Sequence, residues 1–228
     1  MVKNERSTAR REQSLSRDSI IEASIALLDS SGESGLTFRA LAQRLATGAG
    51  AIYWHVANKS DLLTSACDAI VARAMHASQQ QATPQDTLRA LAMAMFDAID
   101  AHPWVGTALM RAPGQLPMVR LLERLGQQVQ ALGVPASAQW ASVSALLHYI
   151  LGAGGQNAAN AREGRELGGD RDGFLEAVSA TWSQLDADQY PFTRSMAPQL
   201  RTHDDRADFL AGMDLLITGM TTMETQHA

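Results

Sequence analysis

The string Tyr53-Trp54-His55 places three side chains together that can contact nucleic acid. Tyrosine and histidine can hydrogen-bond to phosphates or base edges, and tryptophan adds an indole N–H on a large flat surface. Arg39 and Lys59 lie on either side of the string in the sequence and carry the positive charge that phosphates attract. These residue types at this spacing indicate a surface that contacts DNA.

Two short helices are needed to position that string. Thr37 can cap a helix over 38–45, whose apolar residues recur at helical spacing and form one face. A tight turn leads to a very short helix over 49–55, in which Ile52 and Val56 point inward. Two such helices, the second with an aromatic outer face, indicate a helix-turn-helix. The alternative is a small helical cap whose aromatic residues simply pack.

The rest of the chain also reads as helix, with no convincing strand and no internal repeat. Ser16 can cap the first helix, and Thr83-Pro84 combines an N-cap residue with proline at the first helical position. Gly and charged residues over 161–171 predict a surface loop. The further helices are predicted at 58–80, 84–101, 104–110, 117–132, 135–160, 173–185 and 204–223.

Composition fits a folded helical protein, because 46% of the 228 residues are hydrophobic and only 5% are aromatic. The charge divides along the chain: residues 1–60 carry a net +2, whereas the remainder carries −7. The lone Cys67 excludes an intramolecular disulfide. No apolar run is long enough for a membrane span, and the polar start does not resemble a signal peptide. We therefore expect a cytoplasmic protein without a membrane partner.

The segments 41–45 and 51–59 resemble the DNA-binding domain of the TetR family of one-component bacterial regulators, and the Tyr-Trp-His-Val-x-Asn-Lys string is similar to the tetracycline-repressor branch. The resemblance implies a homodimer that binds a palindromic operator in double-stranded DNA, usually as a repressor, and is released by a small-molecule effector. It implies an all-α fold, with an N-terminal three-helix helix-turn-helix domain and a larger helical domain for ligand binding and dimerisation. The candidate DNA-binding residues are Thr37, Arg39, Gly50, Ala51, Tyr53, Trp54, His55 and Lys59.

The start of the recognition helix departs from that branch. Ala49, Gly50 and Ala51 stand where the tetracycline repressor has polar Gln and Thr flanking a Pro. Such small side chains cannot make bidentate contacts with bases, although alanine can touch a thymine methyl group. The operator sequence should therefore differ from the tetracycline operator.

The larger domain is expected to bind a hydrophobic or aromatic effector and no metal or other cofactor. The resemblance places apolar Leu91, Leu109 and Leu125 at the positions that contact the magnesium–tetracycline complex in that branch. The candidate ligand-binding residues are Met95, Phe96, His102, Trp104, Leu109, Met110, Leu125, Trp140 and His148. Residues 207–220 and 133–155 are similar to the two helices of each subunit that form the dimer interface in that branch. The candidate interface residues are Phe209, Met213, Leu216, Ile217 and Met220.

The predicted organisation is a flexible basic arm over 1–15, a DNA-binding domain over 16–62 and an effector-binding and dimerisation domain over 63–228. The arm either follows phosphates or a minor groove or is a disordered tail. No catalytic residue set has a motif around it, so we expect no enzyme activity. The alternatives are a helical enzyme, an architectural DNA-binding dimer without a ligand, and a helical protein-interaction scaffold.

Overall fold

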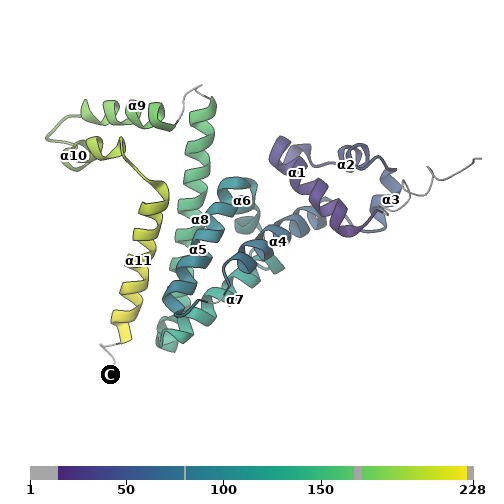
Figure 1. The fold of residues 1–228 in the computed structure, drawn as a ribbon, viewed down its shortest axis with the longest axis horizontal. Coiled ribbons are helices and arrows are strands. Elements are labelled where there is room, and N and C mark those ends of the chain that lie inside the picture. The colour runs from purple at the N-terminus through teal and green to yellow at the C-terminus, as the bar shows by residue number, and fades with distance from the viewer. Residues whose placement is uncertain (1–14, 80, 167–170, 225–228) are drawn as a thin grey trace, which may run out of the picture. The chain divides into compact units, whose positions relative to one another are not determined.

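The computed structural model describes residues 15–79, 81–166 and 171–224, and within these ranges all regular structure is helical. The all-α prediction is therefore confirmed. The helices group into two compact units, one of residues 1–76 with 104–121 and the other of residues 77–103 with 122–228 (Figure 1). The predicted basic arm over 1–15 lies almost entirely outside the described residues.

The first two helices of the first unit begin at residues whose side chains cap them. At the start of the first, the Ser16 hydroxyl accepts a hydrogen bond from the Ser19 N–H, and the Ser19 hydroxyl accepts one from the Ser16 N–H. At the second, the Thr37 hydroxyl accepts from the Ala40 N–H. The helices of this unit are α1 (Arg17–Gly35), α2 (Phe38–Arg44), α3 (Ala49–Tyr53), α4 (Lys59–Ala77) and α6 (Trp104–Arg111).

Helix α6 packs against α1, so the first unit is larger than the predicted domain over 16–62. The Trp104 indole N–H donates to the Asp29 carboxylate at 2.7 Å. The Arg111 guanidinium donates to the Glu33 carboxylate, also at 2.7 Å. Two polar contacts from α6 therefore hold the second half of α1.

The second unit is organised around a long helix, α8 (Ala136–Glu166). Helix α5 (Pro84–Ala101) packs along α8, and α11 (Asp205–Glu224) packs on both (Figure 1). Helices α9 (Arg171–Ser183) and α10 (Pro191–Leu200) form a hairpin near one end of α8. Helix α7 (Leu116–Ala131) belongs to this unit from residue 122 onward.

Two segments differ from the sequence-based prediction. The sequence predicts a surface loop over 161–171, whereas helix α8 continues to Glu166. The alanine, arginine and glutamate residues of this last part favour helix more than its one glycine opposes it. Helix α10 was not predicted at all. Its only local signal is Pro191 at the first helical position, and Pro198 inside the helix argues against a helix when read from sequence.

The core of the second unit contains one face of α5, on which Leu88, Leu91 and Met95 have no exposed surface. Next to it, the Phe209 ring of α11 lies 4.6 Å from the Phe96 ring of α5 and 5.3 Å from the Tyr149 ring of α8, measured between centroids. The Tyr149 hydroxyl donates to the Phe209 carbonyl at 3.0 Å. A Cβ atom on residue 212 would overlap the Tyr149 ring, so this close approach of α8 and α11 requires Gly212.

Four of the five interface residues predicted on α11 lie in the core of the second unit, and their role at a dimer interface stays a prediction. Phe209, Met213, Ile217 and Met220 are all buried within the same chain, where they pack into the core of the second unit. Leu216 is half-buried. These residues are the most apolar set at helical spacing in α11, and they pack into the core of their own chain. The outward surface of α11 is instead marked by Leu215, whose side chain is 76% exposed.

Candidate nucleic-acid interface and cavity

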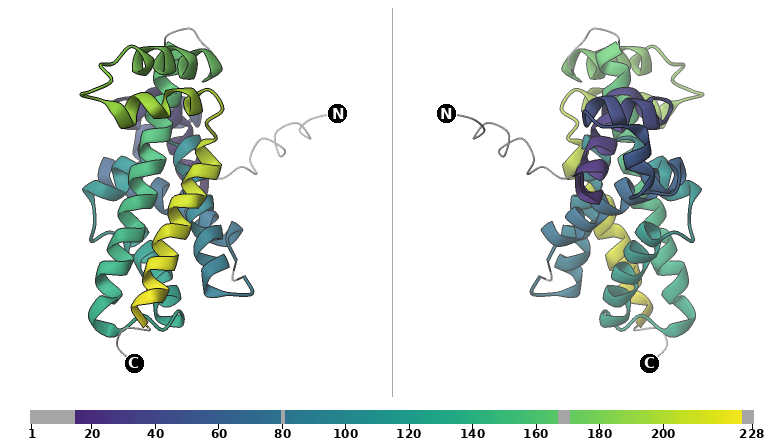
Figure 2. Two further views of the ribbon diagram at one scale, coloured as in Figure 1. Left: turned by 90° about the vertical axis from the view of Figure 1, so that its left-hand side faces the viewer. Right: turned by 90° about the vertical axis from the view of Figure 1, so that its right-hand side faces the viewer.

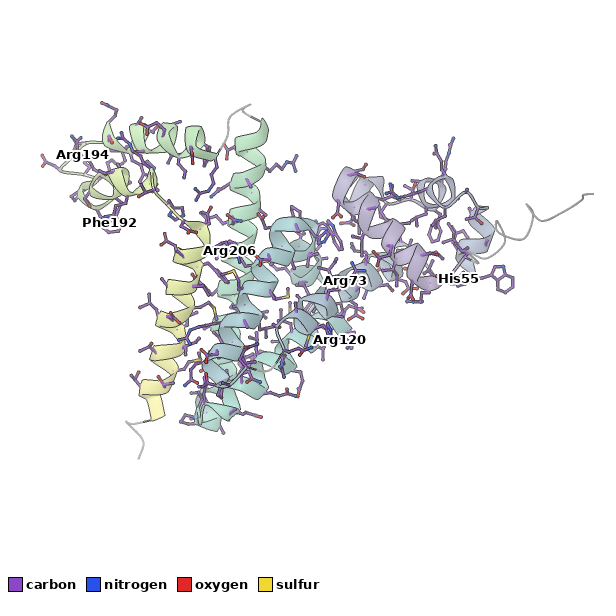
Figure 3. The ribbon with its side chains drawn as sticks, viewed as in Figure 1. His55, Arg73, Arg120, Phe192, Arg194 and Arg206 are labelled. Atoms are coloured by element: carbon purple, nitrogen blue, oxygen red, sulfur yellow. The ribbon has the colours of Figure 1, made fainter. Side chains whose placement is uncertain are left out.

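The exposed aromatic surface lies at the end of α3 in the first unit. Ile52 is fully buried and Val56 nearly so, as expected for the inward face. Trp54 directly after the helix is 89% exposed and Tyr53 is 56% exposed. Figure 3 shows the labelled His55 at the outer surface of this unit. A tryptophan almost completely open to solvent is unusual in a folded domain and is typical of a binding surface.

The chain holds this surface in place through contacts on both sides. The Tyr53 ring stacks on the Phe38 ring of α2, with centroids 4.1 Å apart. The Arg17 guanidinium of α1 donates to the His55 carbonyl at 2.9 Å and to the Ser65 hydroxyl of α4 at 2.7 Å. Arg17 therefore ties the end of the recognition helix to α1 and α4. The sequence pattern did not single out Arg17, because its partners are 38 and 48 residues away.

The start of α4 is fixed by reciprocal hydrogen bonds directly after the aromatic string. The Asn58 side chain accepts from the Asp61 N–H at 2.9 Å, and the Asp61 carboxylate accepts from the Ala57 N–H at 3.0 Å. The Ala57 N–H is the main cause that lowers the pKa of Asp61, and the nearby Arg17 lowers it further. The segment between α3 and α4 is therefore held at both of its ends.

The predicted phosphate-binding residues differ in how free they are. Arg39 is exposed on α2, and no contact that the structure describes engages its guanidinium. The Thr37 hydroxyl caps α2, as described above. The Lys59 ammonium donates to the Glu33 carbonyl at 2.5 Å, so a phosphate would compete with that contact. Gly50 is exposed and a Cβ atom there would meet nothing within 4 Å, so packing within the chain does not require glycine at this position.

A separate cavity of about 880 Å³ lies in the second unit. It is lined by α5, the second half of α8, α9, and the segment that leads from α10 into the first turn of α11. Several side chains in its wall contact one another. Arg206 pairs with Asp97, Arg171 pairs with Asp205 at 2.8 Å, and the Asn157 amide donates to Asp100 at 2.9 Å. Figure 3 shows the labelled Arg206 near the start of α11.

Of the predicted ligand-binding residues, only Phe96 lines this cavity. Met95 and Leu125 are buried in the core of the second unit. Trp140 and His148 belong to the same unit but are exposed to solvent. His102 is half-buried at the end of α5. The remaining three belong to the first unit, where Leu109 is buried, Met110 is exposed and Trp104 contacts Asp29. The structure therefore does not gather the nine residues around one cavity, and their role in ligand binding stays a prediction.

The polar residues before α11 act as a helix cap. The Asp204 carboxylate accepts from the backbone N–H groups of Arg206 and Ala207, which together are the main cause of its lowered pKa. Both ring nitrogens of His203 lie within 3 Å of a carboxylate oxygen, one of Asp205 and one of Asp208. No group of acidic, histidine and cysteine side chains within the described ranges is arranged to hold a metal ion. In the same ranges, no helix is long and apolar enough to cross a membrane.

A helix-turn-helix with an exposed aromatic end, combined with a larger helical unit that contains an open cavity, is typical of the class of ligand-binding transcriptional regulators. Residues 20–66 match the model of bacterial regulatory proteins of the tetR family, and residues 77–224 match that of the tetracyclin repressor-like C-terminal domain. The chain belongs to the TetR family of transcriptional regulators. It is a DNA-binding regulator with a ligand-binding C-terminal domain, and it is not an enzyme.

Individual relatives agree with this assignment. A TetR transcriptional regulator from Streptomyces coelicolor is 51% identical in sequence and superposes with a TM-score of 0.84, covering 92% of this chain and 100% of its own. An HTH-type transcriptional regulator from Saccharopolyspora erythraea is 27% identical over 90% of this chain and 84% of its own length. The Escherichia coli class D tetracycline repressor is 46% identical, but only over 26% of this chain and 27% of its own. Tetracycline-repressor similarity at this level is therefore confined to a short segment.

Proposed function

We propose that this protein is a homodimeric repressor that acts in the cytoplasm, binds a palindromic operator and is released from it by a small aromatic effector. The observation that carries the DNA-binding part is Trp54, a large aromatic side chain almost completely exposed at the end of a recognition helix. An architectural dimer without a ligand is the weaker alternative, because the second unit contains a cavity of ligand size.

One part of the proposed DNA-contacting face contacts base edges, and another part contacts phosphates. Ala49, Gly50 and Ala51 are small and lie at the first turn of α3, so the backbone of that turn can approach the base edges closely. The Trp54 indole and the Tyr53 hydroxyl reach outward beside them, toward the sugar-phosphate backbone. The free guanidinium of Arg39 on α2 supplies a further phosphate contact.

The proposed dimer contact is the outer surface that α8 and α11 share. The two helices lie side by side on one face of the second unit (Figure 2, left). The outward positions of α8 and α11 carry several small residues together with the large exposed Leu215, and α8 also exposes Trp140 and His148. Small side chains let the helices of two subunits approach closely, and a two-fold axis would bring each leucine against the partner. The outward small residues are Ala141, Ala145, Gly152, Ala211, Thr218 and Thr222.

The proposed effector response uses the covalent connections between the units. The chain passes from one unit to the other at residues 76–77, 103–104 and 121–122, which lie in or directly beside α4, α6 and α7. A ligand that displaces α5 in the second unit therefore moves the ends of α4 and α6, and α6 is bonded to α1 through Trp104 and Arg111. A solved structure of the Streptomyces coelicolor TetR family protein ActR, 20% identical and with a TM-score of 0.73, has the same fold and holds actinorhodin, which supports ligand binding as part of the proposal.

Selection of binding sites from random DNA by the full-length protein is expected to enrich an inverted repeat. A dimer places its two recognition helices about one helical turn apart, ~34–36 Å or a related spacing, on equivalent half-sites. The half-sites should differ from those of the tetracycline operator, because α3 begins with Ala49-Gly50-Ala51. Enrichment of single half-sites, or of no sequence at all, would contradict the palindromic operator.

Replacement of Trp54 by alanine is expected to weaken binding to the selected operator by about tenfold or more, since truncation of such an exposed aromatic anchor at an interface typically costs 1–2 kcal/mol or more. The folded state should be unaffected, because Trp54 contributes almost nothing to the core. Phe192→Ala is the matched control, since Phe192 is 74% exposed on α10 of the second unit (Figure 3). Electrophoretic mobility shifts measure both affinities, and equal affinities of the two variants would remove Trp54 from the DNA interface.

A further inference from the structure

The charges in the wall of the second unit's cavity are unequal. Four aspartates line it, Asp97, Asp100, Asp204 and Asp205, against two arginines, Arg171 and Arg206. The wall therefore carries a net charge of −2 with His203 neutral and −1 with His203 protonated, so it is negative in both cases. A cavity with negatively charged walls attracts cations and repels anions.

Internal contacts engage three of the four carboxylates of the wall with an arginine or with two backbone N–H groups. Arg206 forms an ion pair with Asp97. Arg171 forms an ion pair with Asp205 and donates a hydrogen bond to the His203 carbonyl. The Asp204 carboxylate is occupied by the backbone N–H groups that it caps.

Asp100 on α5 receives a single described hydrogen bond, from the neutral Asn157 amide of α8. Its remaining acceptor sites are open to a ligand. An anionic ligand would have to break one of the two arginine pairs, whereas a cationic ligand would find Asp100 free.

The part of the wall that α9 contributes is largely aromatic and apolar. Phe174, Val178 and Trp182 follow one another at intervals of four residues and so lie on one face of α9. All three are half-buried, which leaves part of each side chain facing the cavity. Aromatic faces bind flat rings, and they also attract organic cations through the negative charge of their π-systems.

We propose that this cavity binds an organic ammonium ion that carries an aromatic ring system, with its ammonium group at Asp100 and its rings against Trp182 and Phe174. The proposal rests on the proposed function, in which a small aromatic molecule is the effector, and it adds the charge of that molecule. The volume of about 880 Å³ lies within the range of cavities that take ligands of this size.

Three probes with the same ring system and different charge test the proposal: an (anthracenylmethyl)amine, anthracenylmethanol and anthracenecarboxylate. Each is titrated with the full-length protein in the absence of DNA, and binding is followed by the fluorescence anisotropy of the anthracene. The amine is expected to bind about tenfold more tightly than the alcohol, since an ion pair in a partly exposed site gains an energy of that order, and the carboxylate most weakly. Equal affinities of the three probes, tighter binding of the carboxylate, or no binding of the amine would each overturn the proposal.

Two substitutions separate the charge from the ring contact. Asp100→Asn is expected to lower the affinity for the amine to about that for the alcohol and to leave the alcohol unchanged. Trp182→Leu is expected to lower the affinity for all three probes. Asp188→Asn is the matched control, because Asp188 is an exposed aspartate of the same unit outside the cavity wall. A loss of amine binding in Asp188→Asn as large as in Asp100→Asn would show a diffuse charge effect and overturn the site.

Separate measurements distinguish the ligand class of the cavity from the effect of the ligand on operator binding. The probe titrations contain no DNA and report only the ligand class of the cavity. Whether the amine lowers the affinity for the selected operator is measured separately, with labelled DNA. Binding that depends on Asp100 but leaves the operator affinity unchanged would support the ligand class and contradict the effector role. Release from the operator by the alcohol and not by the amine would support an effector role and contradict the proposed ligand class.

Discussion

Leu215→Glu is expected to leave the chain folded but monomeric, and to lower the affinity for the selected operator by about 100-fold or more. Leu215 is 76% exposed on the outer face of α11, so the isolated subunit tolerates a charged residue there. In a two-fold dimer the substitution introduces two carboxylates into one apolar contact, and each unpaired buried charge costs several kcal/mol. A monomer then holds only one half-site and loses the gain in affinity that comes from linking two recognition helices.

Sedimentation equilibrium measures the mass of this variant, and a mobility shift on the same operator measures its DNA affinity. Leu116→Glu serves as the control, because Leu116 is also an exposed leucine, at the start of α7, and lies outside the proposed contact. The control is expected to remain dimeric. A Leu215→Glu protein that still sediments as a dimer would move the interface away from the outer face of α8 and α11.

Ile52→Ala is expected to destabilise the helix-turn-helix by about 2–5 kcal/mol, the usual loss when a fully buried isoleucine is truncated and a cavity remains. Ile52 has no exposed surface, and α3 is only five residues long. So short a helix has no stability of its own and depends on this anchor. Because the anchor also sets the position of Trp54, operator binding should fall together with stability.

Hydrogen exchange of the full-length protein measures this local effect, since a single unfolding curve would mix two compact units. The amides of α2 and α3 should exchange faster in the variant, while those of α5 and α8 stay protected. Val119→Ala in the same unit is the comparison, because Val119 is 47% exposed and its truncation leaves no cavity. Unchanged protection of α3 in Ile52→Ala would mean that other contacts, such as the Phe38–Tyr53 stack, hold the helix.

The helix-turn-helix could be predicted almost completely from sequence because its determinants are local. Ser16 and Thr37 cap the first two helices within three residues of the groups they bond. Ile52 and Val56 face inward because they are spaced by one helical turn. The recognition helix itself was expected to reach residue 55 and ends at Tyr53. Arg17, which fixes its end, was missed because its hydrogen bonds span the domain.

In the second unit, the sequence by itself determined that the chain is helical and where most helices begin, since caps such as Thr83 act over three or four residues. It could not determine which face of α11 packs into the chain's own core and which face stays exposed. Both faces repeat at helical spacing, and only packing against α5 and α8 assigned Met213 to the core and left Leu215 outside.

The cavity, too, was decided only by tertiary structure. Its wall joins α5, α8, α9 and the start of α11, which are separated by up to 110 residues, and no local pattern records which of their side chains meet. The sequence therefore predicted which residues of the helix-turn-helix are exposed, because the determinants of a recognition helix are local. The cavity and the exposed face of α11 depend on contacts between distant helices, which only the folded chain creates.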